Sequence, residues 1–150
     1  MGCQLASFEH LLVVRWGLPE IRDCAIIDEK VKRLRETSGR EVVYIAVIPE
    51  DLNNFDEDQR ARFERLSEGL MPLLDRMVIV IQATGFRGAV MRSMTTALIL
   101  VARRANTLKV VSSLDAALDE VLDRLPSDHV AVADAFREAG VDVPAKLPAA

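Results

Sequence analysis

The residues best suited to contact a ligand or a partner form a short turn, made of Thr84, Gly85, Phe86 and Arg87. The turn follows an apolar run and precedes a long helical pattern, so unpaired N–H groups at the helix start would point out of it. Those groups and the helix dipole favour a phosphate or a carboxylate, and Arg87 could add a bidentate clamp. Structurally, Thr84 could instead cap the helix while Gly85 supplies the turn conformation. The glycine spacing is not that of a nucleotide-binding loop.

Other candidate polar groups follow other predicted strands. Glu50 and Asp51 could act as general acid and base or hold a divalent cation, although adjacent carboxylates after a strand are also typical of a solvated loop. Ser112 is a candidate contact residue and, with Ser113, a candidate helix cap. No histidine has the partners of a nucleophilic site, and the two cysteines match no metal or redox spacing. We therefore expect a non-catalytic protein without a cofactor or metal.

These candidates need a sheet whose strands end at one edge. Apolar β-forming runs predict four strands, at residues 10–16, 41–48, 77–82 and about 108–111. Amphipathic patterns predict helices from Ile21, from the Asp56 cap, over about 86–105 and from Leu114. The order βαβαβαβα predicts an α/β domain with a four-stranded, mostly parallel sheet and helices on its faces. Ligands of such sheets gather beyond the carboxyl ends of the strands, where the candidates would meet.

Local signals predict the ends and the buried faces of the helices. Asp56 and Gln59 resemble a capping box, and Gly39 should end the first helix. The expected buried face of that first helix consists of Ile21, Cys24, Ile27, Val31 and Leu34. The corresponding face of the helix from Leu114 consists of Leu114, Leu118, Val121, Leu122 and Leu125.

Charge, composition and the absence of targeting signals limit the classes of partner and the cellular location that we expect. Net charge is −4 and 5% of residues are aromatic, which argues against nucleic-acid binding. No secretory signal or membrane-length apolar run is present, so we expect a cytoplasmic protein without stable membrane insertion.

Residues 1–9 are interpreted as a lead-in, 10–126 as the α/β domain, and 127–150 as a short helix with a flexible C-terminal tail. Surplus apolar residues of the helix over 86–105, such as Ile99 and Leu100, are expected either to pack in the core against a neighbouring helix or to form a self-association surface, as in a homodimer.

The order of these patterns resembles the SpoIIAA-like group, the STAS and SEC14-like small domains of bacteria. The resemblance covers residues 10–125 and lies in the runs VVYIAVIPE, VIVIQ, FRGAVMRSMTTALILVARRA, LKVVSS and SLDAALDEVL. Anti-sigma-antagonist members carry an Asp-Ser-Ser-Gly-type turn with a phosphorylated serine, where this chain has Ala83, Thr84 and Gly85, without the acidic neighbour. The resemblance implies a regulatory module that binds other proteins, with Thr84 as the matching hydroxyl. Because some members are thought to bind small or lipidic ligands, the alternative is a binder of such a ligand, anionic or lipidic, at the strand ends.

Overall fold

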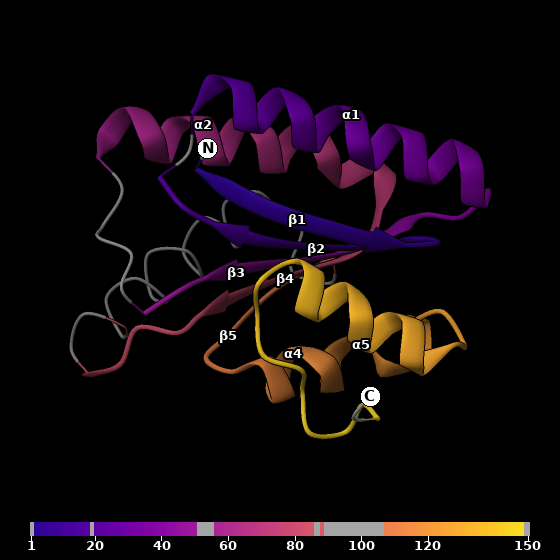
Figure 1. Ribbon diagram of the computed structural model, residues 1–150. Helices are drawn as coiled ribbons and strands as arrows, with labels where there is room; N and C mark the ends of the chain where they lie inside the picture. The colour runs from indigo at the N-terminus through magenta and orange to yellow at the C-terminus, as the bar shows by residue number, and fades with distance from the viewer. Residues whose placement is uncertain (1, 19, 51–55, 86–87, 89–106, 149–150) are drawn as a thin grey trace.

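A mixed five-stranded sheet forms the centre of the computed structural model, which describes residues 2–18, 20–50, 56–85, 88 and 107–148 (Figure 1). The strands, in their order across the sheet, are β1 (Cys3–Phe8), β2 (Leu11–Trp16), β3 (Val42–Ile48), β4 (Leu74–Ile81) and β5 (Leu108–Val111). β1 pairs with β2 in antiparallel orientation, and the remaining neighbours pair in parallel. The parallel strands therefore end at a common edge.

The α/β class is confirmed and most strand pairs are parallel, but the sheet has five strands instead of the four expected for a SpoIIAA-like arrangement, and it is mixed because β1 is antiparallel to β2. The additional strand is β1, which lies in the segment interpreted as a lead-in. Residues 3–8 contain Gln4 and Ser7 and form no continuous apolar run, so their β signal is weak. These residues form a strand because they pair with β2 across a tight turn, in which Glu9 has φ 51°. A neighbouring strand overrides this weak local preference.

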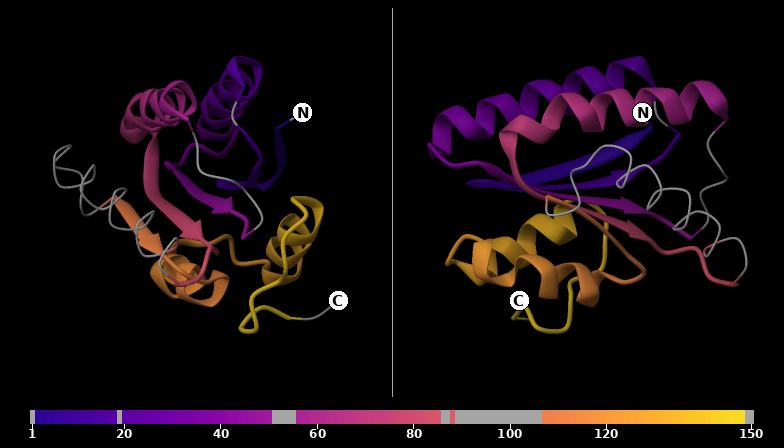
Figure 2. Two further views of the ribbon diagram at one scale, coloured as in Figure 1. Left: turned by 90° about the vertical axis from the view of Figure 1, so that its left-hand side faces the viewer. Right: turned by 180° about the vertical axis from the view of Figure 1, so that it is seen from behind.

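Helices cover both faces of the sheet (Figures 1 and 2). One face carries α1 (Ile21–Ser38) and α2 (Glu57–Leu70), and the short 3-10 helix η1 (Met71–Leu73) leads from α2 into β4. The opposite face carries α4 (Leu114–Val121), η2 (Leu122–Arg124) and α5 (His129–Glu138). Apart from Gly88, the helix expected over 86–105 lies outside the described residues.

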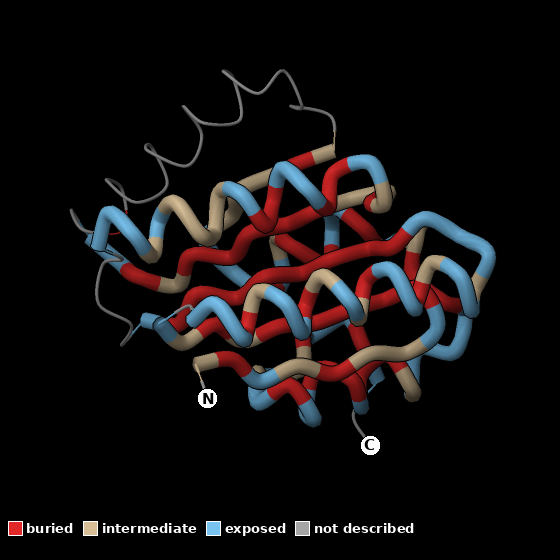
Figure 3. The backbone as a smooth tube through the Cα atoms, turned by 90° about the horizontal axis from the view of Figure 1, so that it is seen from above, coloured by how far each residue is buried: buried red, intermediate tan, exposed pale blue. Residues whose placement is uncertain are grey.

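Two hydrophobic cores lie on either side of the sheet. All seven residues of β3 are buried, as expected for a strand covered on both faces (Figure 3). Because side chains alternate along a strand, Tyr44 points into the core under α1 and α2, whereas Ile45 points into the core under α4 and α5. The sheet is thus the shared wall of both cores.

Most of the predicted helix ends are confirmed. The Asp56 carboxylate accepts a hydrogen bond from the Gln59 N–H over 2.8 Å, and the Gln59 side chain accepts one from the Asp56 N–H. Gly39 ends α1 in the left-handed conformation, with φ 67°. Two predictions of burial are wrong, because Ile21 is 72% exposed and Leu122 is 39% exposed. Both lie at helix ends, since Ile21 is the first residue of α1 and Leu122 is the C-cap of α4.

The C-terminal segment packs on the domain rather than away from it. Leu147 is buried, and Val141 and Val143 pack against the core under α4 and α5. The Ala145 N–H donates to the Asp115 carboxylate over 2.8 Å. These contacts hold residues 141–147 on the surface of α4.

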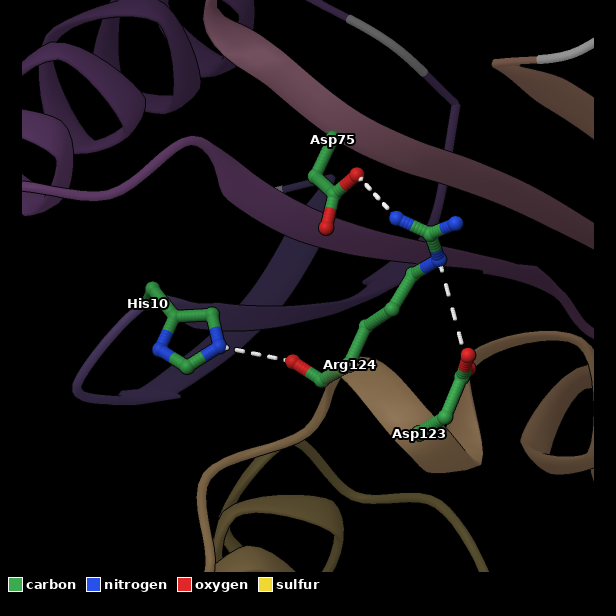
Figure 4. A network of polar contacts seen from close by, with 4 residues as sticks. All are labelled: His10, Asp75, Asp123 and Arg124. Atoms are coloured by element: carbon green, nitrogen blue, oxygen red, sulfur yellow. Dashed lines mark hydrogen bonds and ion pairs between the residues drawn. The ribbon is translucent and has the colours of Figure 1, made fainter.

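A polar network joins the turn between β1 and β2 to β4 and η2 (Figure 4). His10 is 1% exposed, and its Nε2 lies 2.7 Å from the Arg124 carbonyl oxygen, to which it donates. The Arg124 guanidinium contacts the Asp75 carboxylate over 2.6 Å. His10 precedes β2 and Asp75 lies near the start of β4, so the network lies at the end of the sheet opposite the strand carboxyl ends. His10 is a structural residue here.

Candidate functional site

Candidate residues from three strands reach the same edge of the sheet. In the parallel register, Ile48 lies beside Ile81, so Glu50 and Ala83 lie equally far beyond their strands. Val80 lies beside Val111, which places Ser112 next to the end of β4. Glu50, Thr84 and Ser112 are all exposed. The predicted convergence at the strand carboxyl ends is therefore observed for these three residues.

The turn after β4 is anchored at both ends. The Gln82 N–H donates to the Ile48 carbonyl oxygen over 3.0 Å, which ties the end of β4 to β3. The Gly88 N–H donates to the Thr84 carbonyl oxygen over 3.3 Å, a helical i to i+4 pattern. Ala83 and Gly88 are buried, whereas Thr84 and Gly85 are exposed. Thr84 therefore presents its side chain from a backbone that is fixed on both sides.

Gly85 adopts a conformation that other residues rarely accept. Its φ is 65°, in the left-handed region, and a Cβ built there would meet nothing within 4 Å. The requirement for glycine thus comes from the backbone and not from crowding. Phe86, Arg87 and Asp51, three further predicted site residues, lie outside the described residues.

The described residues offer little for metal or acid–base chemistry. Among them, no group of three or more His, Cys, Asp or Glu side chains could hold a metal ion. Glu50 is exposed on a surface turn after the buried Pro49. Such a solvated carboxylate suits hydrogen bonding to a partner better than proton transfer in a closed site.

An aromatic cluster lies at the carboxyl end of β2, beneath α1 and α2. Trp16 and Tyr44 are fully buried, and the Trp16 indole N–H donates to the Tyr44 hydroxyl over 3.2 Å. The Phe63 ring of α2 meets Trp16 edge-on, with centroids 5.1 Å apart. Burial raises the pKa of Tyr44 above its usual range, although the Trp16 hydrogen bond acts in the opposite direction. The cluster fixes α2 against β2 and β3.

Both cysteines lie next to this aromatic cluster. Burial raises the pKa of the Cys3 thiol to about 12, and a backbone hydrogen bond at Gly17 opposes the shift. Burial also raises the pKa of Cys24. The positive charge of Arg62 in α2 acts in the opposite direction, because it favours the thiolate. Both shifts disfavour the reactive thiolate. These thiols are therefore poor nucleophiles.

Sequence reasoning missed a groove between the outer surfaces of α1 and α2, which Cys24 lines with other residues of both helices. The periodicity assigned Ile21 and Cys24 to the buried face of α1, and only the placement of α2 shows that both border open space. A signal was present in α2, where Asp58, Arg62 and Arg65 recur at helical spacing. Such a charged stripe is equally typical of a solvated face.

Comparison of the chain with protein-family models, curated proteins and solved structures finds no match. Among the described helices, none combines the length and the apolar character required to cross a membrane. The structure establishes an α/β domain with a mixed five-stranded sheet and helices on both faces.

Proposed function

We propose that the protein is a non-catalytic cytoplasmic regulatory domain that binds another protein through the turn after β4, as the resemblance to STAS-like domains implies. The observation that carries this proposal is the contrast within that turn, where exposed Thr84 lies between buried Ala83 and buried Gly88. A hydroxyl presented from an anchored backbone can bind a partner without the entropy cost of ordering a loose loop. Glu50 and Ser112 extend the polar surface to the neighbouring strands.

Thr84 is also the residue at which binding would be regulated. A phosphoryl group would add roughly −1.5 to −2 charges at neutral pH and three acceptor oxygens. It would lie just beyond β4, beside the end of β3 that Glu50 follows, so it would repel an acidic partner or recruit a basic one. Phosphorylation would thus change which partner binds, without any change in the fold.

The test compares capture of partners by variants at two exposed threonines. Thr84→Ala and Thr84→Glu alter the proposed contact, while Thr37→Ala and Thr37→Glu make the same changes at the C-terminal end of α1, remote from the strand carboxyl ends. Affinity capture from the native cell, with quantitative mass spectrometry and phosphopeptide mapping, should give a partner that the Thr84 variants lose and the Thr37 variants keep. The affinity of that purified partner should then fall about tenfold or more with Thr84→Glu. Equal capture by all four variants would show that Thr84 is not the contact.

The second candidate is binding of a small anionic or lipidic ligand at the same edge. It is favoured by the adjacent carboxyl ends of β3 and β4, the place where open parallel sheets bind ligands. A thermal-shift series with inorganic phosphate, short carboxylates and phospholipid micelles distinguishes it from protein binding. A saturable rise in Tm that Arg87→Ala abolishes would favour the ligand, and an unchanged Tm across the series would exclude these ligand classes.

A further inference from the structure

A groove of about 690 Å³ runs between the outer surfaces of α1 and α2. Its lining residues recur at steps of three and four on each helix, so one stripe of α1 faces one stripe of α2. The α1 stripe consists of Ile21, Cys24, Ala25 and Asp28, and the α2 stripe consists of Asp58, Arg62, Arg65, Leu66 and Gly69. The α1 stripe is therefore mainly apolar, and the α2 stripe is mainly charged.

Exposed apolar side chains lie at the N-terminal end of α1, where Ile21 and Ala25 line the groove. Ile21 is 72% exposed, and Leu18, three residues before it, is 44% exposed. Ala25 continues the same stripe one turn further along α1 and is also exposed. Adjacent exposed apolar side chains beside a groove are typical of an interaction surface.

The charges along the groove identify the partner that fits. Two acidic residues, Asp28 and Asp58, and two basic residues, Arg62 and Arg65, line the groove, and Asp28 is already ion-paired with Lys32 of α1 over 2.8 Å. The α2 stripe therefore carries both signs, so a partner of one sign would meet repulsion as well as attraction. Asp58 and Arg65 are two helical turns apart, about 10 Å along α2, with opposite signs. Within the described residues, neither of these two side chains makes an ion pair. A two-fold axis between them would place each aspartate against the arginine of a second copy.

We propose that the groove between α1 and α2, with its apolar α1 stripe, is a two-fold symmetric homodimer interface in which Asp58 of each copy meets Arg65 of the other. Ile21 of each copy then enters the opposite groove and loses its exposure to water. This interface is distinct from the turn after β4, so the dimer and the proposed partner site would coexist. It also differs from the self-association expected at residues 86–105, which, apart from Gly88, lie outside the described part of the chain.

The size of the surface predicts a weak dimer. α1 has 18 residues and α2 has 14, so the helices are about 27 Å and about 21 Å long. Side by side they present a flat footprint of roughly 500 Å² per copy, at the low end of specific interfaces. The dimer should therefore form and dissociate with protein concentration, and it should respond strongly to single charge changes.

A charge-reversal cycle in α2 tests the proposed pairing. Sedimentation equilibrium of the full chain from about 1 μM to about 1 mM should show a monomer–dimer equilibrium. Asp58→Arg and Arg65→Glu should each raise the dimer Kd by roughly tenfold or more, because like charges then face each other. The double variant Asp58→Arg/Arg65→Glu exchanges the two signs and should restore a Kd within about threefold of the original value.

Matched controls separate this pairing from a general effect of charge. Glu57→Arg and Arg60→Glu make the same changes on exposed positions of α2 that do not line the groove, and should leave the Kd unchanged. Circular dichroism should show that all the variants fold alike. A protein that is monomeric over the whole range would overturn the proposal. So would a dimer that ignores the groove variants, or a double variant as weak as the single ones.

Alkylation of the two thiols gives a second readout on the unmodified chain. Cys24 lines the groove, whereas Cys3 lies in β1 inside the core. With iodoacetamide in fixed excess, the alkylation rate of Cys24 should fall as the protein concentration passes the dimer Kd, while that of Cys3 should not. If the Cys24 rate is independent of concentration although a dimer is present, the interface lies elsewhere and the proposal is wrong.

Discussion

Cys3 and Tyr44 are weak acids whose burial keeps them protonated in the folded protein. Their side chains belong to the same core under α1 and α2. For both, the folded-state pKa is raised, so the unfolded chain loses the proton first as pH increases. At neutral pH both states hold these protons, and in alkali the fold loses stability because only the unfolded chain ionises.

The thiol of Cys3 provides the prediction at the scale of single residues. Its pKa rises from an ordinary 9.0 to about 12, so below pH 9 both states hold the proton and stability is unaffected. From pH 9 towards pH 12 the unfolded state alone ionises, so the free energy of unfolding should fall by up to about 1.4 kcal/mol per pH unit. Urea unfolding of the wild type and of Cys3→Ala between pH 8 and about pH 11 measures this.

The comparison with Cys3→Ala isolates the thiol. Tyr44 ionises in the unfolded state of both proteins, so it contributes equally to both pH profiles. The variant should be less stable at pH 8, because it loses buried volume, but its stability should decline less steeply above pH 9. Parallel declines in the two proteins would show that Cys3 is not the titrating group.

At the scale of elements, the two adjacent serines before α4 have different roles. The sequence predicted both as caps, whereas in the structure Ser113 is the N-cap residue, and its hydroxyl accepts from the Ala116 N–H over 3.1 Å. Ser112 is exposed at the end of β5, on the candidate edge. One serine therefore stabilises the helix, and its neighbour belongs to the proposed contact surface.

Alanine substitutions should separate the two serines. Ser113→Ala leaves an N–H at the start of α4 without its side-chain acceptor, so it should lower the free energy of unfolding by about 1 kcal/mol. Ser112→Ala, on the exposed neighbour, should change it by less than about 0.5 kcal/mol. Urea titrations of the two variants measure the difference. A larger loss for Ser112→Ala than for Ser113→Ala would reverse the assignment of the cap.

At the scale of the whole molecule, β1 closes one side of the domain. It completes the edge of the sheet beside β2, and the Gln4 amide donates to the Glu138 carbonyl oxygen at the end of α5 over 2.9 Å. The start of β1 also passes close to Gly17, where a Cβ would lie 1.9 Å from the Gly2 carbonyl oxygen. Only glycine at position 17 permits this approach.

Gly17→Ala should therefore displace β1 from the rest of the sheet. We expect a loss of about 1–3 kcal/mol in the free energy of unfolding, because backbone must move to accept the methyl group. Hydrogen exchange should show that the amides of residues 3–8 lose protection while those of β3 keep it. Leu18→Ala, at a neighbouring exposed position, is the control and should leave β1 protected. Unchanged protection of residues 3–8 in Gly17→Ala would contradict the close approach.

Much of the architecture follows from local patterns. The all-apolar run of β3 predicted a strand buried on both faces, and the spacing of Ile27, Val31 and Leu34 predicted the buried face of α1. The Asp56 capping box was also predictable, because its partners are three residues apart. Such features depend on contacts within one turn or one strand, which the sequence displays directly.

The candidate site was predictable in part. The edge with Glu50, Thr84 and Ser112 follows from strand order, because parallel strands that end together bring their following residues together. The fixed backbone on both sides of Thr84 could not be predicted, since it requires the contact between β4 and β3. The groove between α1 and α2 depends on how two helices separated in sequence by residues 39–56 pack.

The sequence by itself determined the α/β class, the buried parallel strands and the candidate turn at Thr84, because each is encoded in residues close together along the chain. Only the tertiary structure decided that residues 3–8 form an edge strand. It also decided that Ile21 is exposed and that His10 is bonded to a distant carbonyl oxygen. The physical reason is the same in each case. A short weak strand, a helix end or a buried polar group is stabilised by partners far away in sequence, and local preference does not identify those partners.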